Sequence, residues 1–204
     1  MGKKIGFDIG SCLGERISDF EDFDEIYAFE PSPCVFNFLF EKCKNDSRIK
    51  CFQIGVSDED GFKKFNCHDH YGYSSFLEID QEGELSKEWH QVDPGFDNVI
   101  LVAEVETKRM DTFMKENCID HIDFIKVDTQ GNDLNVVKSL GEMINKVDII
   151  EMEVQMKSFY KESCSREEIF EFMQKNNFDL VSEEENGFSQ WENERRLVFK
   201  RCSK

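Results

Sequence analysis

The sequence predicts an α/β fold with a doubly wound, mostly parallel, Rossmann-like sheet, and three observations support this. Short apolar runs with strand character alternate with helical patterns along most of the chain. The first of these runs ends in a turn with two glycines that leads into a helical pattern, as in a βα unit. Two further strand-like runs follow the last helical pattern and close the sheet as a pair.

Length and charge limit the organisation and the partners. The 204 residues predict one domain over 1–204, with an irregular insert at about 67–98. The 25 Lys and Arg residues against 43 Asp and Glu residues give a net charge of −18. A chain this acidic is poorly suited to nucleic acid or to an anionic membrane surface. We therefore expect a neutral or cationic partner and no nucleic-acid or membrane binding.

Cysteine usage and the apolar runs indicate the compartment. The eight cysteines are scattered without a CxxC pair, as expected for reduced thiols of a cytosolic protein. Apolar runs are too short to span a bilayer. The first strand begins within a few residues of Met1, which leaves no room for a signal peptide. We expect a cytoplasmic protein.

The first predicted strand covers 5–9, where apolar side chains alternate with Gly6 and Asp8. Gly10 and Gly14 end it, and 13–17 open a helical pattern. Glycine permits a sharp turn and the close approach of a ligand. Ligands of open α/β sheets bind beyond the carboxyl ends of the strands, so this turn is the first candidate binding element.

The chemistry of this turn favours S-adenosylmethionine over NAD. The spacing is GxxxG, and Cys12 stands where a dinucleotide-binding turn has its second glycine. The carboxylate of Asp8 would repel a diphosphate, but it suits the ammonium and sulfonium charges of S-adenosylmethionine. A glycine turn this short also occurs in unrelated α/β domains, so the motif alone leaves that alternative open.

The second predicted strand covers 26–30, and Pro31 keeps the residue before it extended. Ser32 and Pro33 suit the N-cap and first position of a helix. Apolar residues then recur at helical spacing: Val35, Phe36, Leu39, Phe40 and Cys43. Glu30 thus ends a strand twenty residues after Gly10, where an acidic side chain can accept hydrogen bonds from ribose hydroxyls.

A third strand at 49–56, a turn at 57–61 and a short strand at 62–65 are predicted next. The insert at 67–98 has no clear period, and such a stretch is usually functional or mobile. Its Cys67, His68 and His70 do not have a recognised zinc spacing, and we predict no metal.

The remaining pattern completes the alternation of strands and helices. Strands are predicted at 99–105, 122–128, 147–154, 178–182 and 196–200, helices at 109–117, from 134 and at 165–176, and an acidic turn at 183–187. Carboxylates end four of the core strands: Asp8, Glu30, Asp128 and the pair Glu151 and Glu153. We expect them to line one edge of the sheet.

With these motifs in place, the chain resembles the FkbM family of S-adenosylmethionine-dependent methyltransferases. The resemblance rests on five blocks in the family's order: 7–14, 26–33 (IYAFEPSP), 55–61 (GVSDEDG), 124–133 (FIKVDTQGND), and Glu153-Val154 with Tyr160 downstream. It implies the class I methyltransferase fold, a seven-stranded sheet whose last strand is antiparallel. It also implies methyl transfer to a hydroxyl oxygen, commonly on a sugar or a glycosylated small molecule.

The resemblance also implies site roles by position. Asp8, Gly10 and Gly14 would form the cofactor turn and Glu30 would hold the ribose. Val56 and Ser57 would border the adenine, and Asp128 would face the methionine end of the cofactor or the acceptor.

Two departures from the family pattern affect this carry-over. Family members usually have helices before the first strand, whereas this sequence begins directly on it. We expect that the part covering the cofactor on that side is missing or comes from a partner chain, and a homo-oligomer is one expectation. The family's DxQGxE has Asp133 at its last position here.

The acceptor hydroxyl needs a proton acceptor. We predict Asp128 first and Glu153 second, with His68, His70, Lys126 and Tyr160 as further candidates. For Lys126, a salt bridge with Asp128 or Glu153 is preferred over catalysis.

Two alternatives to a methyltransferase stay open on the sequence. A non-catalytic module could bind the cofactor or a partner on the same fold. An NAD-dependent dehydrogenase is disfavoured by the missing GxGxxG and by Asp8. The acceptor's identity within small molecules and glycans is left open.

Overall fold

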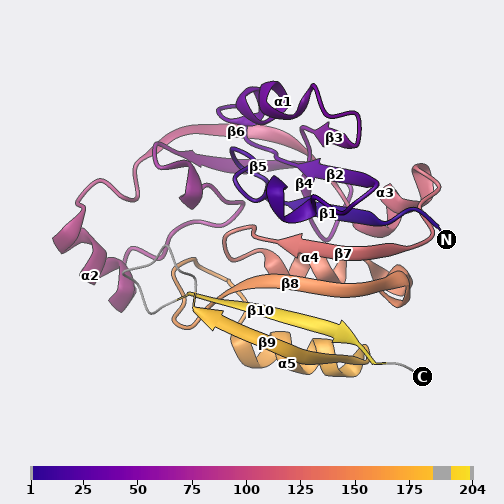
Figure 1. Cartoon of the computed structure of the whole chain (residues 1–204). Helices are drawn as coiled ribbons and strands as arrows, with labels where there is room; N and C mark the ends of the chain where they lie inside the picture. Colours follow the sequence, from indigo (N-terminus) through magenta and orange to yellow (C-terminus); the bar gives the residue numbers. More distant parts are fainter. Residues whose placement is uncertain (1, 186–193, 203–204) are drawn as a thin grey trace.

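The computed structural model describes residues 2–185 and 194–202 (Figure 1). In chain order the elements are β1 (Ile5–Ile9), η1 (Ile17–Phe20), β2 (Glu25–Phe29), α1 (Phe36–Cys43), β3 (Ile49–Phe52), β4 (Gly55–Val56), β5 (Gly61–His68), η2 (Tyr71–Tyr73), α2 (Glu84–Val92), β6 (Val99–Lys108), α3 (Met110–Glu116), β7 (Ile122–Val127), α4 (Asp133–Lys138), η3 (Gly141–Lys146), β8 (Val147–Gln155), α5 (Arg166–Lys175), β9 (Phe178–Glu185) and β10 (Glu194–Arg201).

The main sheet has seven strands in the order β3-β2-β1-β7-β8-β10-β9. The first five are mutually parallel, whereas β10 is antiparallel to both of its neighbours, β8 and β9. The predicted α/β sheet with an antiparallel last strand is therefore confirmed. The order changes direction at β1, which lies between β2 and β7, so their carboxyl ends form the topological switch point where ligands of such sheets gather.

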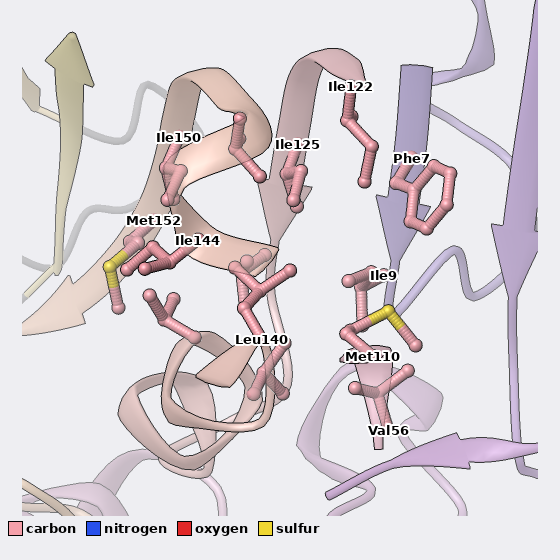
Figure 2. Close-up of a cluster of buried hydrophobic side chains, with 14 of the residues drawn as sticks. Phe7, Ile9, Val56, Met110, Ile122, Ile125, Leu140, Ile144, Ile150 and Met152 are labelled. Carbon is pink, nitrogen blue, oxygen red and sulfur yellow. The ribbon is translucent and has the colours of Figure 1, made fainter. Parts of the chain in front are cut away.

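One face of this sheet carries the main core. Side chains of β1, β7 and β8 meet α3, α4, η3 and α5 there. Figure 2 shows the part of this core that includes Phe7, Met110 and Ile144. Phe113 of α3 contacts the rings of Phe7, Tyr27, Phe29 and Phe52 edge-on, at centroid distances of 4.9–6.0 Å. Four of the twenty phenylalanines thus fasten β1, β2 and β3 to α3.

The opposite face is covered unevenly. Phe20 of η1 lies so close to Gly6 that a Cβ there would be 2.5 Å from its ring. Leu39 of α1 packs against Ala28 of β2. Over β7 and β8 the same face is open, with a hollow of about 1190 Å³ lined by Phe124, Ile149 and charged side chains.

Several predicted boundaries were wrong. The expected helix after Gly14 is a turn followed by η1, because Cys12 and Gly14 adopt positive φ and interrupt helical hydrogen bonding. The single strand expected at 49–56 is two strands, β3 and β4, which belong to different sheets. The helix α1 begins at Phe36, later than Pro33, and Phe40 on its expected inner face is exposed.

The insert at 67–98 is more regular than predicted. Strand β5 runs on to His68, and η2 and α2 follow. The rings of Tyr73, Trp89, Phe96 and Phe159 pack together as a small aromatic core of this region. The amino-terminal part of the predicted acidic turn at 183–187 is strand β9, and its end lies outside the described residues.

Strands β4, β6 and β5 form a second, three-stranded sheet. Strand β4 pairs only with Thr107 and Lys108 of β6, so the amino-terminal part of β6 is an edge. Four consecutive residues there, 99–102, are 42–54% exposed although all are large and apolar. Within the described part of the chain, no helix is both long and apolar enough to cross a membrane.

Candidate active site

The turn after β1 is built on the backbone. The amides of Gly10 and Ser11 both donate to the carbonyl oxygen of Phe29 at 3.0 Å, and the amide of Asp128 donates to Ile9 at 3.0 Å. Gly10 has φ +78°, and a Cβ on it would lie 1.8 Å from the carbonyl oxygen of Asp128. Glycine is therefore required for the ends of β1 and β7 to approach this closely.

Glu30, at the end of β2, joins the turn after β1 to the turn after β2. Its Oε2 accepts from the amide of Cys12 and its Oε1 from the amide of Ser32, both at 2.8 Å. The side chain is 5% exposed, and burial raises the pKa of its carboxyl to about 7. Each carboxylate oxygen can accept a second hydrogen bond, so Glu30 still offers acceptors to a ligand.

A cavity of about 130 Å³ lies at the carboxyl ends of β1, β2 and β7. Its polar walls include Gly10, Cys12, Glu30 and Asp128, and its apolar walls include Phe29, Ile54, Val56, Phe65 and Phe76. Small-molecule sites usually measure about 300–1,000 Å³. The cavity is therefore large enough for only part of such a ligand, and Tyr71, Gly72, Ser74 and Phe76 of the insert line one side of it.

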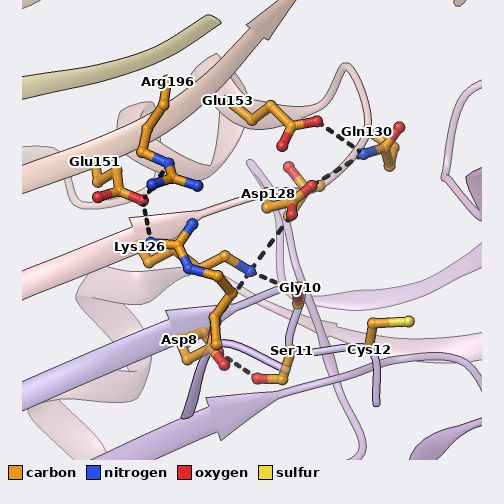
Figure 3. Close-up of polar contacts among 12 residues, drawn as sticks. Asp8, Gly10, Ser11, Cys12, Lys126, Asp128, Gln130, Glu151, Glu153 and Arg196 are labelled. Carbon is orange, nitrogen blue, oxygen red and sulfur yellow. Dashed lines mark hydrogen bonds and ion pairs between the residues drawn. The ribbon is translucent and has the colours of Figure 1, made fainter. Parts of the chain in front are cut away.

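Lys126 of β7 is the central charge beside this cavity (Figure 3). Its Nζ lies 3.1 Å from Oδ1 of Asp8 and 3.5 Å from Oδ2 of Asp128, and it donates to the carbonyl oxygen of Gly10 at 3.0 Å. Lys126 is 4% exposed and Asp8 is fully buried. These neighbouring carboxylates raise the pKa of Lys126 although burial opposes this. The expected ion pair with Asp128 is present, and Lys126 is a fixed cation.

Asp128 and Glu153 are brought together by an amide (Figure 3). The Nε2 of Gln130 donates to Oδ1 of Asp128 at 2.9 Å and to Oε1 of Glu153 at 3.4 Å. Burial raises the pKa of Glu153 well above its usual range, and repulsion from Asp128 adds to this. The two carboxylates predicted to act on the acceptor therefore lie at the same strand ends.

The other carboxylates at this edge have different partners. Glu151 binds Arg16 at 2.8 Å and Arg196 at 3.4 Å, which leaves it in a charge cluster. Asp133, which stands where the family has Glu, accepts from the amides of Thr129 and Gly131 at 2.9 and 3.0 Å. Its shorter side chain thus fastens the turn after β7. Burial raises the pKa of Asp133 to about 6.

Of four further residues predicted to bind the cofactor, one lines the cavity and three do not. Val56 lines it, whereas Asp8, Gly14 and Ser57 are not among the residues that line it. The hydroxyl of Ser57 accepts from Lys63 at 2.9 Å and donates to Asp58 at 3.0 Å. Cofactor contacts for Asp8, Gly14 and Ser57 stay predictions.

The remaining candidates for a base are placed outside this cluster or fully buried. His68 is buried at the end of β5, and burial lowers its pKa. The ring of His70 stacks on Tyr73 at 4.5 Å. Tyr160 is fully buried, and its hydroxyl contacts Gln130 at 3.1 Å.

One group outside this site could hold a cation. His121, Asp123 and Asp148 bring ligand atoms within 4.8 Å of one another at the amino ends of β7 and β8. The Nε2 of His121 lies 3.2 Å from Oδ2 of Asp148 and 3.7 Å from Oδ1 of Asp123. This group lies at the opposite end of the strands from Asp128. Its Asp123 and Asp148 also line the hollow of about 1190 Å³, which extends over the sheet to Arg16 and Glu151.

Sequence reasoning missed several residues of the site. Gln130 stands inside the quoted motif, but only its distances reveal its bridging role. Arg16 and Arg196 reach Glu151 from elements 180 positions apart in the chain, and Tyr71 and Phe76 enter the cavity wall from the insert. No local pattern indicates these contacts, because they depend on the order of the strands.

Comparison with known proteins identifies the family to which the sequence belongs. Residues 8–180 match the model of the methyltransferase FkbM domain. A curated relative, the 2-O-methyltransferase NoeI of Sinorhizobium fredii (strain NBRC 101917 / NGR234), is 25% identical over 163 residues. The match covers 78% of this chain, and the chain spans 64% of the length of that relative.

Solved structures share the fold at low sequence identity. The methyltransferase FkbM of Methylobacillus flagellatus KT matches with a TM-score of 0.61 and 13% identity, over 97% of this chain and 43% of that one. Fibrillarin of Aeropyrum pernix, solved with natively bound S-adenosyl-L-methionine, matches with a TM-score of 0.55 and 10% identity, over 97% and 66% of the two chains. Magnesium protoporphyrin IX methyltransferase of Synechocystis PCC 6803, with bound SAM, gives 0.54 and 8%, over 98% and 71%.

Proposed function

The chain belongs to the methyltransferase FkbM domain family, and from this premise we propose that it transfers a methyl group to a hydroxyl oxygen of a sugar, glycan or glycosylated small molecule. Membership of this family supports S-adenosylmethionine-dependent methyl transfer, and the fold agrees with it. The transfer to an oxygen and the sugar acceptor are the finer parts of the proposal. We also propose a single domain over 1–204 with 67–98 as its insert, and a homo-oligomer stays a prediction.

The residues around the cavity suit S-adenosylmethionine in their chemistry. Glu30 offers carboxylate acceptors to the ribose hydroxyls, and the apolar walls at Ile54 and Val56 suit the adenine. Gly10 and Cys12 border the same space, and Asp128 supplies a negative charge for the cationic end. The bound cofactor supplies an electrophilic methyl group on a sulfonium sulfur.

The observation that carries the acceptor side is the pair of carboxylates at the ends of β7 and β8. Asp128 and Glu153 share the Gln130 amide and can accept hydrogen bonds from an acceptor hydroxyl. A carboxylate with a raised pKa is a stronger base, so Glu153 in its ionised form suits removal of the hydroxyl proton. Holding the hydroxyl in line contributes on the order of 7–11 kcal/mol in well-oriented systems.

A hydroxylated, uncharged acceptor agrees with the charges of the chain. NoeI is a 2-O-methyltransferase, which supports an oxygen acceptor. The net charge of −18 opposes a polyanion such as nucleic acid. Carboxylates and arginines at the strand ends, including Asp128, Glu153 and Arg196, are suited to binding several hydroxyl groups.

The test is transfer of labelled methyl from S-adenosylmethionine to a panel of mono- and oligosaccharides and their glycosides. We expect product with a subset of sugars and none with RNA or DNA. Cofactor binding by calorimetry without transfer to any hydroxyl acceptor would favour the non-catalytic module. Transfer only to a nitrogen or carbon acceptor would contradict the oxygen assignment.

The affinity for S-adenosylhomocysteine should rise with pH through about 7 if Glu30 binds the ribose. The ordinary pKa of a glutamate is near 4.5, and burial raises that of Glu30 to about 7, so the carboxyl is largely protonated at pH 6 and ionised at pH 8. Only the ionised form offers acceptors on both oxygens. Calorimetric titrations should give up to about a tenfold gain in affinity from pH 6 to pH 8.

Glu30→Gln supplies the control for this pH dependence. Its amide does not titrate, so its affinity should be lower at pH 8 and nearly flat across the range. The same gain with pH in wild type and in Glu30→Gln would assign the titration to another group and remove Glu30 from the ribose site.

A further inference from the structure

The side chain of Gln130 connects three buried or half-buried groups from different elements. Its Nε2 donates to Asp128 at 2.9 Å and to Glu153 at 3.4 Å, and its Oε1 accepts from the hydroxyl of Tyr160 at 3.1 Å. These partners follow β7, lie on β8 and precede α5. One amide thus uses both of its hydrogens on carboxylates and its oxygen on a hydroxyl.

The backbone of Gln130 is fixed independently of its side chain. Its φ is +53°, which is uncommon for a residue other than glycine. The carboxylate of Asp133 accepts from the amides on either side, those of Thr129 and Gly131, at 2.9 and 3.0 Å. The carbonyl oxygen of Gln130 accepts from the hydroxyl of Ser75 at 2.8 Å. The side chain therefore starts from a fixed point, and its amide lies between the two carboxylates.

The direction of the amide decides whether it attracts or repels the carboxylates. An amide turned by 180° would point its oxygen at both Asp128 and Glu153. Tyr160 favours the attractive direction because its hydroxyl can donate to the amide oxygen. This hydroxyl also lies 3.0 Å from the carbonyl oxygen of Tyr73, and its one hydrogen serves both acceptors. Tyr160 is fully buried, so its hydroxyl depends on these internal partners.

Resting on the proposed function, we propose that Gln130 is a positioning residue that holds the Asp128 and Glu153 carboxylates side by side, and that Tyr160 sets the direction of its amide. Hydrogen bonds donated to a carboxylate favour its charged form. Burial and repulsion from Asp128, Glu194 and Asp133 raise the pKa of Glu153, and Lys126 lowers it. The amide of Gln130 acts in the same direction as Lys126 and offsets part of the rise. The consequence is a base that is ionised at a lower pH than its surroundings alone would allow.

The test follows the Glu153 carboxyl directly by NMR titration of protein labelled with ¹³C at the glutamate side-chain carboxyls, with Glu153→Gln to assign the signal. Gln130→Met keeps a long unbranched side chain but removes the amide. We expect the pKa of Glu153 to rise by about one pH unit in Gln130→Met. In Tyr160→Phe it should rise by a smaller amount, because the amide is then free to turn.

Matched controls remove the same groups elsewhere. Gln53→Met replaces an exposed amide, and Tyr27→Phe removes a hydroxyl that binds Glu25 and Lys50. Neither should move the Glu153 signal. An unchanged pKa of Glu153 in folded Gln130→Met would overturn the role of Gln130. If Gln130→Met does not fold, an unchanged pKa in Tyr160→Phe overturns the proposal, and a raised one supports it.

This measurement needs neither an acceptor nor turnover, so it separates the two proposals. A shifted Glu153 pKa without transfer to any sugar would leave the positioning role standing and remove the proposed acceptor. If the protein methylates a sugar but neither variant changes the pKa of Glu153, the proposed function stands and the positioning role is contradicted. Once an acceptor is identified, the acid limb of the pH–rate profile should shift to higher pH in Gln130→Met.

Discussion

Replacement of Lys126 by methionine is expected to lower the free energy of unfolding by about 3–5 kcal/mol. Lys126 is the cation of a buried cluster, 3.1 Å from the fully buried Asp8 and 3.5 Å from Asp128. Methionine fills a similar volume, so the main loss is the charge. The carboxylate of Asp8 would then be buried without its counter-ion, which costs more than the pair itself contributes.

Urea unfolding of four proteins measures this effect: wild type, Lys126→Met, Asp8→Asn and the double variant. The double variant should recover part of the loss, because no isolated charge is then buried. Lys50→Met is the matched control, since Lys50 is half exposed and pairs with Glu25 at the surface, and it should change stability by less than about 1 kcal/mol. A loss of the same size in Lys50→Met and Lys126→Met would contradict the buried-charge explanation.

Asp128→Asn should abolish most methyl transfer while the protein still folds. The variant keeps the shape of the side chain and removes its charge, at the topological switch point between β1 and β7. Asp128 contacts Lys126 and the Gln130 amide and lines the cavity. Loss of a group that accepts or orients the acceptor proton typically costs about 10²–10⁴-fold in rate.

Calorimetry with S-adenosylhomocysteine decides which ligand Asp128 serves. Weaker binding together with lost turnover would assign it to the cofactor, and unchanged binding with lost turnover would assign it to the acceptor. Asp148→Asn is the control, because this half-exposed carboxylate lies at the amino end of β8. Wild-type turnover of Asp128→Asn on an identified acceptor would remove Asp128 from the active site.

Local pattern was enough to predict the strands and most of the helices. The alternation in 5–9 and the apolar runs at 122–128 and 147–154 correspond to β1, β7 and β8 within one residue. The prediction from local pattern failed where one continuous apolar run forms two separate elements. The stretch at 49–56 reads as a single strand, but β3 pairs with β2 while β4 pairs with β6. Which partner a strand takes is a non-local property.

By itself, the sequence determined the α/β class, the family and the carboxylates that end the core strands, because each of these depends on short local patterns and their order along the chain. Tertiary structure alone decided how those carboxylates are used. Parallel pairing of β1 with β7 sets Asp8 opposite Lys126, 118 positions away. Pairing of β7 with β8 brings Gln130 within 3.4 Å of Glu153. Strand order and register fix these distances, and they arise from packing of the whole sheet, which local periodicity does not contain.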